Sequence, residues 1–403
     1  MEDSVRSERI DGEVAPGFEA VREAFVANFE EDRDVGAACC VYVEGRPVVD
    51  LWGGSTDAGS KLPWRRDTLV PVFSATKGAT TIVCHRLAER GQLDLDAPVA
   101  AIWPEFGIED KDEITTRTIL THRAGLPAIE RRLSREELLA RTPVVTALAS
   151  QRPLWEPETD YGYHALTFGW LLDEIVRRAT GRSISAILAA EVAGPLGLDL
   201  FIGLPEAEES RVAALNDPPP PDPAALAQIK DPAALEIVMK MGAAMQDPDS
   251  LLSRALSSNG ALPTPRADSW NRRDVHGAEL PAANGITDAR SLARMYAACI
   301  GEVDGVRLLA EETVDAAVAE RSSGPDRVLF IPNRFGSGFM LDSAPVPMLS
   351  GASFGHTGAG GALAFADREA GVAFAFTPNQ LGGGPSGDPR TGTLISALRT
   401  SLG

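Results

Sequence analysis

Ser74 and Lys77 stand three residues apart, at the start of a stretch with helical periodicity. Residues at this spacing lie on the same face of a helix, so the hydroxyl and the amine come within reach of each other. The positive end of the helix dipole stabilises an alkoxide and disfavours a protonated lysine. A serine hydroxyl needs such help to act as a nucleophile, so the pair predicts nucleophilic catalysis. By itself the spacing is equally typical of a helix-capping serine beside a surface lysine.

The segments around this pair have clear patterns. An extended run at 68–73 leads into Ser74, and an amphipathic helix is predicted over 76–90. An N-terminal helix is expected at 18–31. Two β-rich runs, 36–43 and 47–52, flank the turn Glu44-Gly45 and predict a hairpin.

The rest of the chain changes from helical to extended patterns. Further helices are predicted at 134–150 and 164–180, a loop over the surface or over a cleft at 216–223, and an irregular stretch at 257–284. The remaining predicted elements are a helix at 287–301 with Thr287 or Asp288 as N-cap, strands at 334–341, 351–358, 361–367 and 371–378, and a helix at 390–401.

This order predicts an α+β fold with a central antiparallel sheet flanked by helices. The sheet subdomain would comprise 1–73 plus 285–403. A mainly helical subdomain, 74–284, would be inserted between them. The active site is then expected in the cleft between the two subdomains.

Composition restricts the classes of partner. The 403 residues are 44% hydrophobic and 24% charged, as in ordinary soluble globular proteins, and the net charge is −19. A negative field repels nucleic acid and anionic lipid, so neither is expected as a partner. The charged start of the chain has no apolar core of a signal peptide, and no long apolar run follows. A cytoplasmic protein without membrane contact is therefore predicted.

The cysteines and histidines do not suggest a metal site. Cys39, Cys40, Cys84 and Cys299 lack metal-ligand spacing and predict buried thiols. Adjacent Cys39 and Cys40 would alternate across a strand, so at most one should face the core. The scattered histidines include no His-Glu-x-x-His run, and no metal or other cofactor is expected. The absence of a usable Gly-x-Ser-x-Gly elbow argues against an α/β-hydrolase.

Several motifs together carry a resemblance to a known family. The run Thr68-Leu-Val-Pro-Val-Phe-Ser-Ala-Thr-Lys-Gly-Ala, followed by Leu93-Asp-Leu-Asp-Ala-Pro-Val99, resembles the first motif of the class C β-lactamase/penicillin-binding superfamily of serine hydrolases. Leu120-Thr-His-Arg-Ala-Gly-Leu-Pro127 resembles a loop of that superfamily. Asp160-Tyr-Gly-Tyr-His-Ala resembles its second motif, Tyr-x-Asn, and Gly355-His-Thr-Gly-Ala-Gly-Gly361 its third, Lys-Thr-Gly. The matches follow the family's order over most of the chain.

Two departures favour one branch of the superfamily. The second motif has Ala165 in place of asparagine. The third begins with His356 in place of lysine, and a histidine is only fractionally charged at neutral pH. Both changes weaken recognition of an anionic lactam. They resemble the family VIII carboxylesterases, whose main substrates are simple esters and some of which keep slight β-lactamase activity.

The resemblance implies an acyl-enzyme mechanism. Ser74 would be the nucleophile, and Lys77 or Tyr163 the base, with the choice between them open. The backbone N–H groups of Ser74 and Ala359 would form the oxyanion hole, and Tyr163 would activate water for deacylation. The residues expected to contact substrate are His356, Thr357, Gly358, Gly360, Ala165 and His164. Gly358 and Gly360 would let their strand approach closely.

Other residues near these motifs receive lesser roles. Tyr161 could be mistaken for the catalytic tyrosine, but the residues that follow favour Tyr163. His122 is expected to be a structural hydrogen-bonding group. His164 lines the cleft or faces solvent, two alternatives that the sequence leaves equal. His85 and His276 are expected to be inert.

The predicted function is hydrolysis of short-chain carboxylic esters, so the expected partner is a small-molecule ester. A β-lactamase or a D-amino-acid peptidase or amidase on the same scaffold is the first alternative. A transacylase follows, and an inactive sensor that binds acyl ligands is the alternative of another class. The sequence leaves the oligomeric state and the physiological substrate open.

Overall fold

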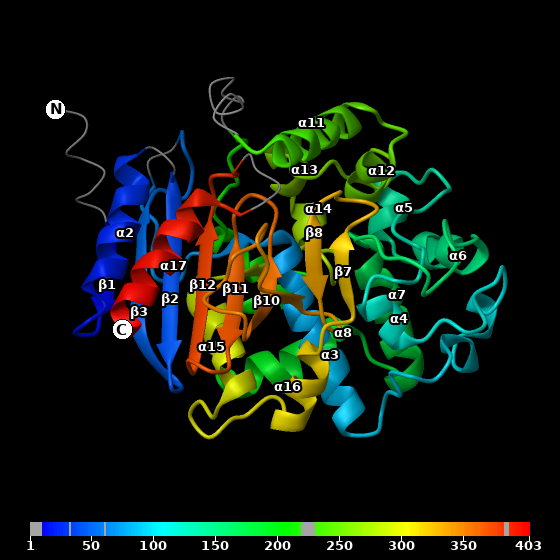
Figure 1. Cartoon of the computed structure of the whole chain (residues 1–403), viewed down its shortest axis with the longest axis horizontal. Coiled ribbons are helices and arrows are strands. Elements are labelled where there is room, and N and C mark those ends of the chain that lie inside the picture. The colour runs from blue at the N-terminus through cyan, green and yellow to red at the C-terminus, as the bar shows by residue number, and fades with distance from the viewer. Residues whose placement is uncertain (1–9, 32–33, 60–61, 219–229, 383–386) are drawn as a thin grey trace.

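The structure is a computed structural model that describes residues 10–31, 34–59, 62–218, 230–382 and 387–403. From position 219 onward the loop predicted at 216–223 lies outside these residues. A large sheet runs through the molecule and a group of helices lies beside it (Figure 1). This arrangement confirms the predicted α+β fold.

The large sheet is antiparallel and uses both ends of the chain. Among the described residues its strand order is β1-β3-β2-β12-β11-β10-β9-β8-β7. The strands are β1 Ile10–Val14, β2 Gly36–Val43, β3 Arg46–Gly54, β7 Ser322–Pro325, β8 Pro332–Phe335, β9 Met340–Leu341, β10 Ser353–Thr357, β11 Leu363–Asp367 and β12 Val372–Pro378. The pairing of β2 with β12 joins the early hairpin to the late strands.

One predicted strand is wrong in detail. The expected single strand at 334–341 is two short strands, β8 and β9, that pair with each other. Gly338 lies between them with φ +93°, a conformation that favours glycine and reverses the chain. An added Cβ there would lie 2.4 Å from Thr81 Oγ1, so the turn packs directly on the helix that follows Ser74.

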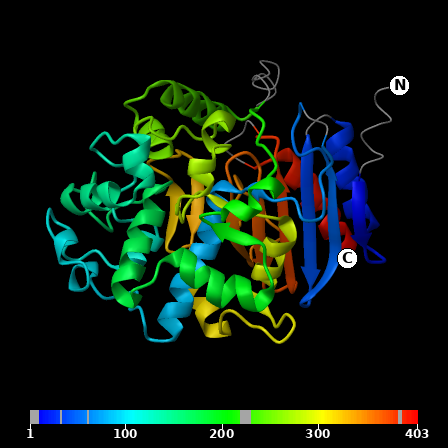
Figure 2. The same cartoon turned by 180° about the vertical axis from the view of Figure 1, so that it is seen from behind.

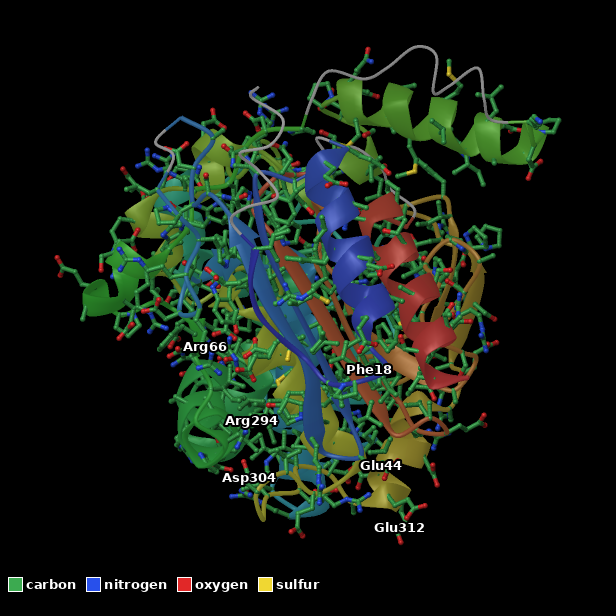
Figure 3. All side chains as sticks on the ribbon, turned by 90° about the vertical axis from the view of Figure 1, so that its left-hand side faces the viewer. Phe18, Glu44, Arg66, Arg294, Asp304 and Glu312 are labelled. Atoms are coloured by element: carbon green, nitrogen blue, oxygen red, sulfur yellow. The ribbon has the colours of Figure 1, made fainter. Side chains whose placement is uncertain are left out.

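Helices cover both faces of the sheet. Two helices, α2 (Glu19–Glu30) and α17 (Pro389–Leu402), lie side by side on one face, and α15 (Ala289–Ile300) lies on the other (Figures 1 and 3). Cys39 and Cys40 point to opposite faces of β2, and both are fully buried, in two different hydrophobic clusters. The expectation that at most one of them faces the core is therefore wrong, because each face of the sheet has its own core.

The remaining helices gather beside the sheet, as the view from behind shows (Figure 2). They are α3 Thr76–Glu89, α4 Thr116–Leu120, α5 Arg135–Leu139, α6 Thr142–Ser150, α7 Thr167–Thr180, α8 Ile184–Leu188, α9 Gly194–Leu196, α11 Pro232–Gln246, α12 Leu251–Ser257, α13 Ala267–Trp270, α14 Arg273–His276 and α16 Glu311–Val318. None of the helices in the described part of the chain has the length and apolar character needed to cross a membrane. The division into 1–73 plus 285–403 and 74–284 stays a prediction.

The helix predicted at 134–150 is broken into α5 and α6. Arg141 lies between them with φ +65°, and Pro143 stands in the first turn of α6. Proline lacks a backbone N–H and its ring clashes with the carbonyl four residues earlier, so α5 must end before it. Similarly, α7 begins at Thr167 and not at His164. His164 and Ala165 are thereby left in the loop that precedes the helix.

A small second sheet, which sequence analysis missed, holds the segment before Ser74. Its order is β4-β6-β5, with β4 Val70–Pro71, β6 Gly285–Thr287 and β5 Leu200–Ile202. The Val72 N–H donates to Gly285 O at 2.9 Å. The Gly285 N–H in turn donates to Thr76 Oγ1 at 2.8 Å. The chain on either side of Ser74 is thus tied to one distant residue.

The contact of the Tyr296 side chain, from α15, with Gly78 of α3 yields a stability prediction. An alanine at Gly78, next to Lys77, would place its Cβ 2.0 Å from the hydroxyl of the buried Tyr296. We expect Gly78→Ala to lower the free energy of unfolding by about 1–3 kcal/mol, the usual effect of overpacking. Urea denaturation measures this change.

Gly392→Ala is the matched control, because a Cβ at this helical position of α17 meets open space. It should leave stability unchanged or raise it by up to about 1 kcal/mol, the difference in helix propensity. Equal stability of the Gly78→Ala protein and wild type would contradict the described packing.

Candidate active site

Ser74 lies in a tight helical turn, η1 (Phe73–Ala75), that runs directly into α3. Phe73 precedes it with φ +46°, a left-handed conformation that is unusual for a bulky residue and typical of strained functional sites. The first hydrogen bond of the turn runs from the Ala75 N–H to Val72 O. The Ser74 N–H therefore precedes the bonded part of the helix. Ser74 is partly exposed, whereas Phe73 and Ala75 are buried.

Lys77 is fully buried, and its amine has three hydrogen-bonding neighbours. Its Nζ lies 3.0 Å from Ser74 Oγ, 2.7 Å from Ala165 O and 2.9 Å from Ala282 O. Burial lowers the pKa of Lys77 well below its usual range. A neutral amine has two N–H groups and one lone pair. Since carbonyl oxygens only accept, a neutral Lys77 would donate both N–H groups to Ala165 and Ala282 and leave its lone pair for the Ser74 hydroxyl.

Tyr163 completes this group from the loop before α7. Lys77 Nζ lies 4.8 Å from the centroid of its ring. Burial raises the pKa of the Tyr163 phenol, and a hydrogen bond with Ser74 opposes that shift only in part. The phenol is therefore neutral at pH 7 and carries a proton that it can donate. Tyr161 lies elsewhere, with its hydroxyl donating to Asn333 O at 3.0 Å.

Two histidines hold the loop that carries Tyr163 and Ala165. His164 is buried; its Nε2 accepts from the Leu126 N–H at 3.0 Å, and its Nδ1 donates to Gly162 O at 2.7 Å. The solvent-facing alternative for His164 is therefore wrong. Burial lowers its pKa to about 4. The Nδ1 atom of His122 accepts from the His164 N–H at 3.1 Å, which agrees with the structural role expected for His122.

The turn that follows β10 lies against the chain just before Ser74. A Cβ at Gly358 would lie 2.1 Å from Val72 O, so glycine permits this close approach. The Gly361 N–H closes the turn by donating to Gly358 O at 3.2 Å. Within the described residues the Ala359 N–H makes no hydrogen bond and is available as a donor. Gly360 has φ +86°, and its carbonyl accepts from Arg390 at 2.7 Å, so it shapes the turn.

His356 and Thr357 end β10 beside Tyr163. The His356 ring is buried and its centroid lies 5.9 Å from that of Tyr163. Burial lowers the pKa of His356 to about 3, and the nearby Lys77 amine adds to this shift only when it carries a proton. Expected to be fractionally charged at neutral pH, His356 is instead uncharged, because its surroundings exclude water. Thr357 is partly exposed, and its Oγ1 lies 3.8 Å from Met340 Sδ.

Sequence analysis missed three contributors to this site. Ala282 supplies only a backbone carbonyl, which no residue pattern reveals. Asp326, a buried acid in the loop between β7 and β8, accepts from the Tyr163 N–H but lies in no recognised motif. Arg390 is buried in α17 and is paired with Asp34 and Asp388. Across the described parts of the chain no cluster of three His, Cys, Asp or Glu residues could hold a metal ion.

Comparison with known proteins agrees with this architecture. The sequence model of the Beta-lactamase family matches residues 23–398, and the chain belongs to this family. It is a serine hydrolase of the β-lactamase fold, within the superfamily that includes penicillin-binding proteins.

Its relatives include named esterases. The chain is 37% identical to "Esterase/beta-lactamase LipL" of Mycobacterium tuberculosis, over 93% of this chain and 83% of that protein. The crystal structure of a family VIII carboxylesterase superposes with a TM-score of 0.83 at 35% identity, covering 96% of this chain and 98% of that one. The structure of EstA from Arthrobacter nitroguajacolicus Rue61a also superposes with a TM-score of 0.83 at 35% identity, covering 97% of this chain and 98% of that one.

The burial of Lys77 predicts a particular pH dependence of stability. In the unfolded chain lysine stays protonated up to about pH 10.4, whereas the folded protein holds Lys77 neutral at lower pH. Between these two pKa values the unfolded state binds one more proton, so the wild type gains stability as pH rises. Relative to Lys77→Met, this gain should approach about 1.4 kcal/mol per pH unit. Urea unfolding at several pH values from neutral to mildly alkaline measures it.

Lys240→Met, which removes an exposed amine on α11, is the control and should run parallel to wild type. If the free energy of unfolding changes with pH in the same way in Lys77→Met and in the wild type, Lys77 is not held neutral.

Proposed function

We propose that this protein hydrolyses small, uncharged carboxylic esters through an acyl-enzyme on Ser74. The observation that carries this proposal is the position of the buried Lys77 Nζ, which lies within hydrogen-bond distance of two carbonyl oxygens and of Ser74 Oγ. In a neutral amine the two carbonyls take both N–H groups, which leaves the lone pair for the Ser74 hydroxyl. That arrangement suits an amine that removes a proton and does not suit one that only neutralises charge. The esterase names of the relatives add support.

Acylation begins with proton transfer from Ser74 to Lys77. The Ser74 Oγ–H proton moves to Nζ as Oγ bonds to the ester carbonyl carbon, and the carbonyl π electrons move to its oxygen. The backbone N–H groups of Ser74 and Ala359 would stabilise that oxyanion. Lys77 is preferred to Tyr163 as the base because burial favours neutral forms of both groups. A neutral amine can accept a proton, whereas a neutral phenol must first lose one.

Collapse of the tetrahedral intermediate breaks the bond to the alcohol oxygen. Tyr163 donates its phenolic proton to this oxygen, and the alcohol leaves. The proton on Lys77 then passes to the phenolate, which restores both groups. In deacylation Tyr163 directs a water molecule whose proton is accepted by the Lys77 amine. The water oxygen bonds to the acyl carbon, Ser74 Oγ leaves, and it regains a proton from Lys77.

The uncharged character of the site favours uncharged substrates. His356 stands where the superfamily's third motif has a lysine, and its pKa of about 3 leaves it without charge at pH 7. Ala165 offers only a methyl group where the superfamily's second motif has an amide side chain. A site of this kind gains little from the carboxylate of a lactam. Thr357, Gly358, Ala165 and His356 are the proposed neighbours of the bound acyl group; Gly360 and His164 support them from behind.

Hydrolysis of β-lactams is the second candidate, favoured by the double name of the mycobacterial relative. Amide hydrolysis ranks lower because an amine leaving group demands more complete protonation. A cytoplasmic location and a small-molecule ester as partner remain parts of this proposal.

A substrate panel tests the proposal. We expect the purified protein to hydrolyse short-chain (about C2 to C6) nitrophenyl esters at least about 100-fold faster than nitrocefin or D-alanyl nitroanilide, as judged by kcat/KM. Ser74→Ala should reduce ester hydrolysis by about 10⁴-fold or more because the covalent route is lost. Ser210→Ala, at an exposed serine, is the matched control and should have wild-type activity. Full activity of Ser74→Ala would overturn the proposal, and faster turnover of nitrocefin would replace it by the second candidate.

A further inference from the structure

Asp326 is a buried acid that contacts the backbone of the proposed catalytic tyrosine. Its side chain is 1% exposed. The Tyr163 N–H donates to both of its oxygens, at 3.1 Å to Oδ1 and 3.0 Å to Oδ2. Oδ1 also accepts from the N–H groups of Val328 at 2.7 Å and Leu329 at 2.8 Å. Backbone donors therefore surround the carboxylate.

This acid has no opposite charge to offset its burial. Within the described residues no ion pair joins Asp326 to an arginine, lysine or histidine, although arginine pairs with many other acids of the chain. Taking a carboxylate out of water without a cation is unfavourable unless hydrogen bonds stabilise the charge. A neutral side chain could close the loop between β7 and β8 at a lower free-energy cost of desolvation. The buried charge of Asp326 therefore calls for a functional reason.

The loop that contains Asp326 is closed on itself and joined to the tyrosine segment. The Phe330 N–H donates to Asp326 O at 2.8 Å, and the Asp326 N–H donates to Ile331 O at 3.1 Å. Phe330 has φ +65°, so the loop is held in a conformation that a free chain would avoid. The Arg327 N–H reaches across to Tyr161 O at 3.2 Å. The loop is thus a rigid support on which residues 161–163 lie.

We propose that Asp326 is a positioning residue for Tyr163, whose ionised carboxylate holds the tyrosine backbone so that the phenol can protonate the leaving alcohol. This inference rests on the proposed function. It assigns Asp326 no contact with substrate. Protonation of the carboxyl turns one of the two oxygens that accept from the Tyr163 N–H into an O–H donor, which weakens the hold on the tyrosine backbone.

The charge state of Asp326 changes in an accessible pH range. Burial raises its pKa to about 6, and the N–H groups of Leu329, Tyr163 and Val328 limit the rise. The ionisable groups that face it are Asp160, which raises its pKa further, and the two tyrosines, Tyr161 and Tyr163. The Arg327 guanidinium points to Asp160, at 3.2 Å. Proton donation by Tyr163 should therefore be lost as pH falls through about 6.

The test compares two esters of the same acid, ethyl butyrate and nitrophenyl butyrate. Nitrophenolate leaves without a proton, whereas ethoxide needs one. Since kcat/KM reports the steps up to acylation, protonation of Lys77 changes both values alike and cancels in their ratio. The ratio of ethyl to nitrophenyl kcat/KM isolates proton donation by Tyr163. In the wild type it should fall about 10-fold as the pH is lowered from neutral to mildly acidic, with a midpoint near 6.

Asp326→Asn keeps the shape of the side chain but places an amide where one carboxylate oxygen faced the Tyr163 N–H. We expect its ratio to be about 10-fold below wild type at neutral pH and to be independent of pH. Asp160→Asn, at the half-exposed neighbouring acid, is the matched control. It should keep the wild-type profile with a slightly lower midpoint, because Asp160 raises the pKa of Asp326.

The inference would be overturned if the ratio of ethyl to nitrophenyl kcat/KM in the wild type does not change with pH. It would also be overturned if Asp326→Asn has the same ratio as the wild type. If Asp326→Asn does not fold, the wild-type and Asp160→Asn profiles decide. A midpoint near 6 that shifts down in Asp160→Asn supports the inference, and a flat ratio or an unshifted midpoint overturns it. Failure of the proposed function is recognised separately, because Ser74→Ala would then retain hydrolysis of both esters.

Discussion

The buried amine of Lys77 is the constraint on which the rest of the site depends. An ammonium ion in this position would need charge compensation, but its neighbours are two backbone carbonyls and a hydroxyl. Burial therefore favours the neutral amine, and the carbonyls consume its two donors. On our proposal the remaining lone pair faces Ser74. Geometry and desolvation would then activate the serine without a further charged residue.

This arrangement requires three distant segments to meet within hydrogen-bond distance. Lys77 comes from α3, Ala165 from the loop before α7, and Ala282 from the chain before β6. Close backbone approach makes the meeting feasible: a Cβ at Gly169 would lie 2.6 Å from the Ala282 N atom. Two histidines whose pKa values are lowered by burial hold the loop of Tyr163, and on our proposal Asp326 fixes its backbone. The polar groups of the site are thus supported mainly by backbone atoms.

This dependence on backbone atoms explains what the sequence could and could not predict. Side-chain motifs predicted Ser74, Lys77, Tyr163 and His356 as site residues, and the structure brings these four together. Short apolar, β-rich runs predicted the hairpin and the late strands. The Ala282 carbonyl and the small sheet β4-β6-β5 leave no residue signature, because any amino acid offers the same groups. The charge of His356 was wrongly predicted for a related reason. Titration depends on burial, and burial is a property of the assembled fold.

Labelling with a fluorophosphonate tests the central claim most directly, because the reagent forms a stable bond to an activated serine. Its leaving group, fluoride, departs without help from an acid. The account predicts that mass spectrometry finds the label on Ser74. It also predicts that Lys77→Met slows labelling by about 10²- to 10⁴-fold, the usual contribution of a general base. A label on another residue, or an unchanged rate of Ser74 labelling in Lys77→Met, would contradict activation of the serine by the buried amine.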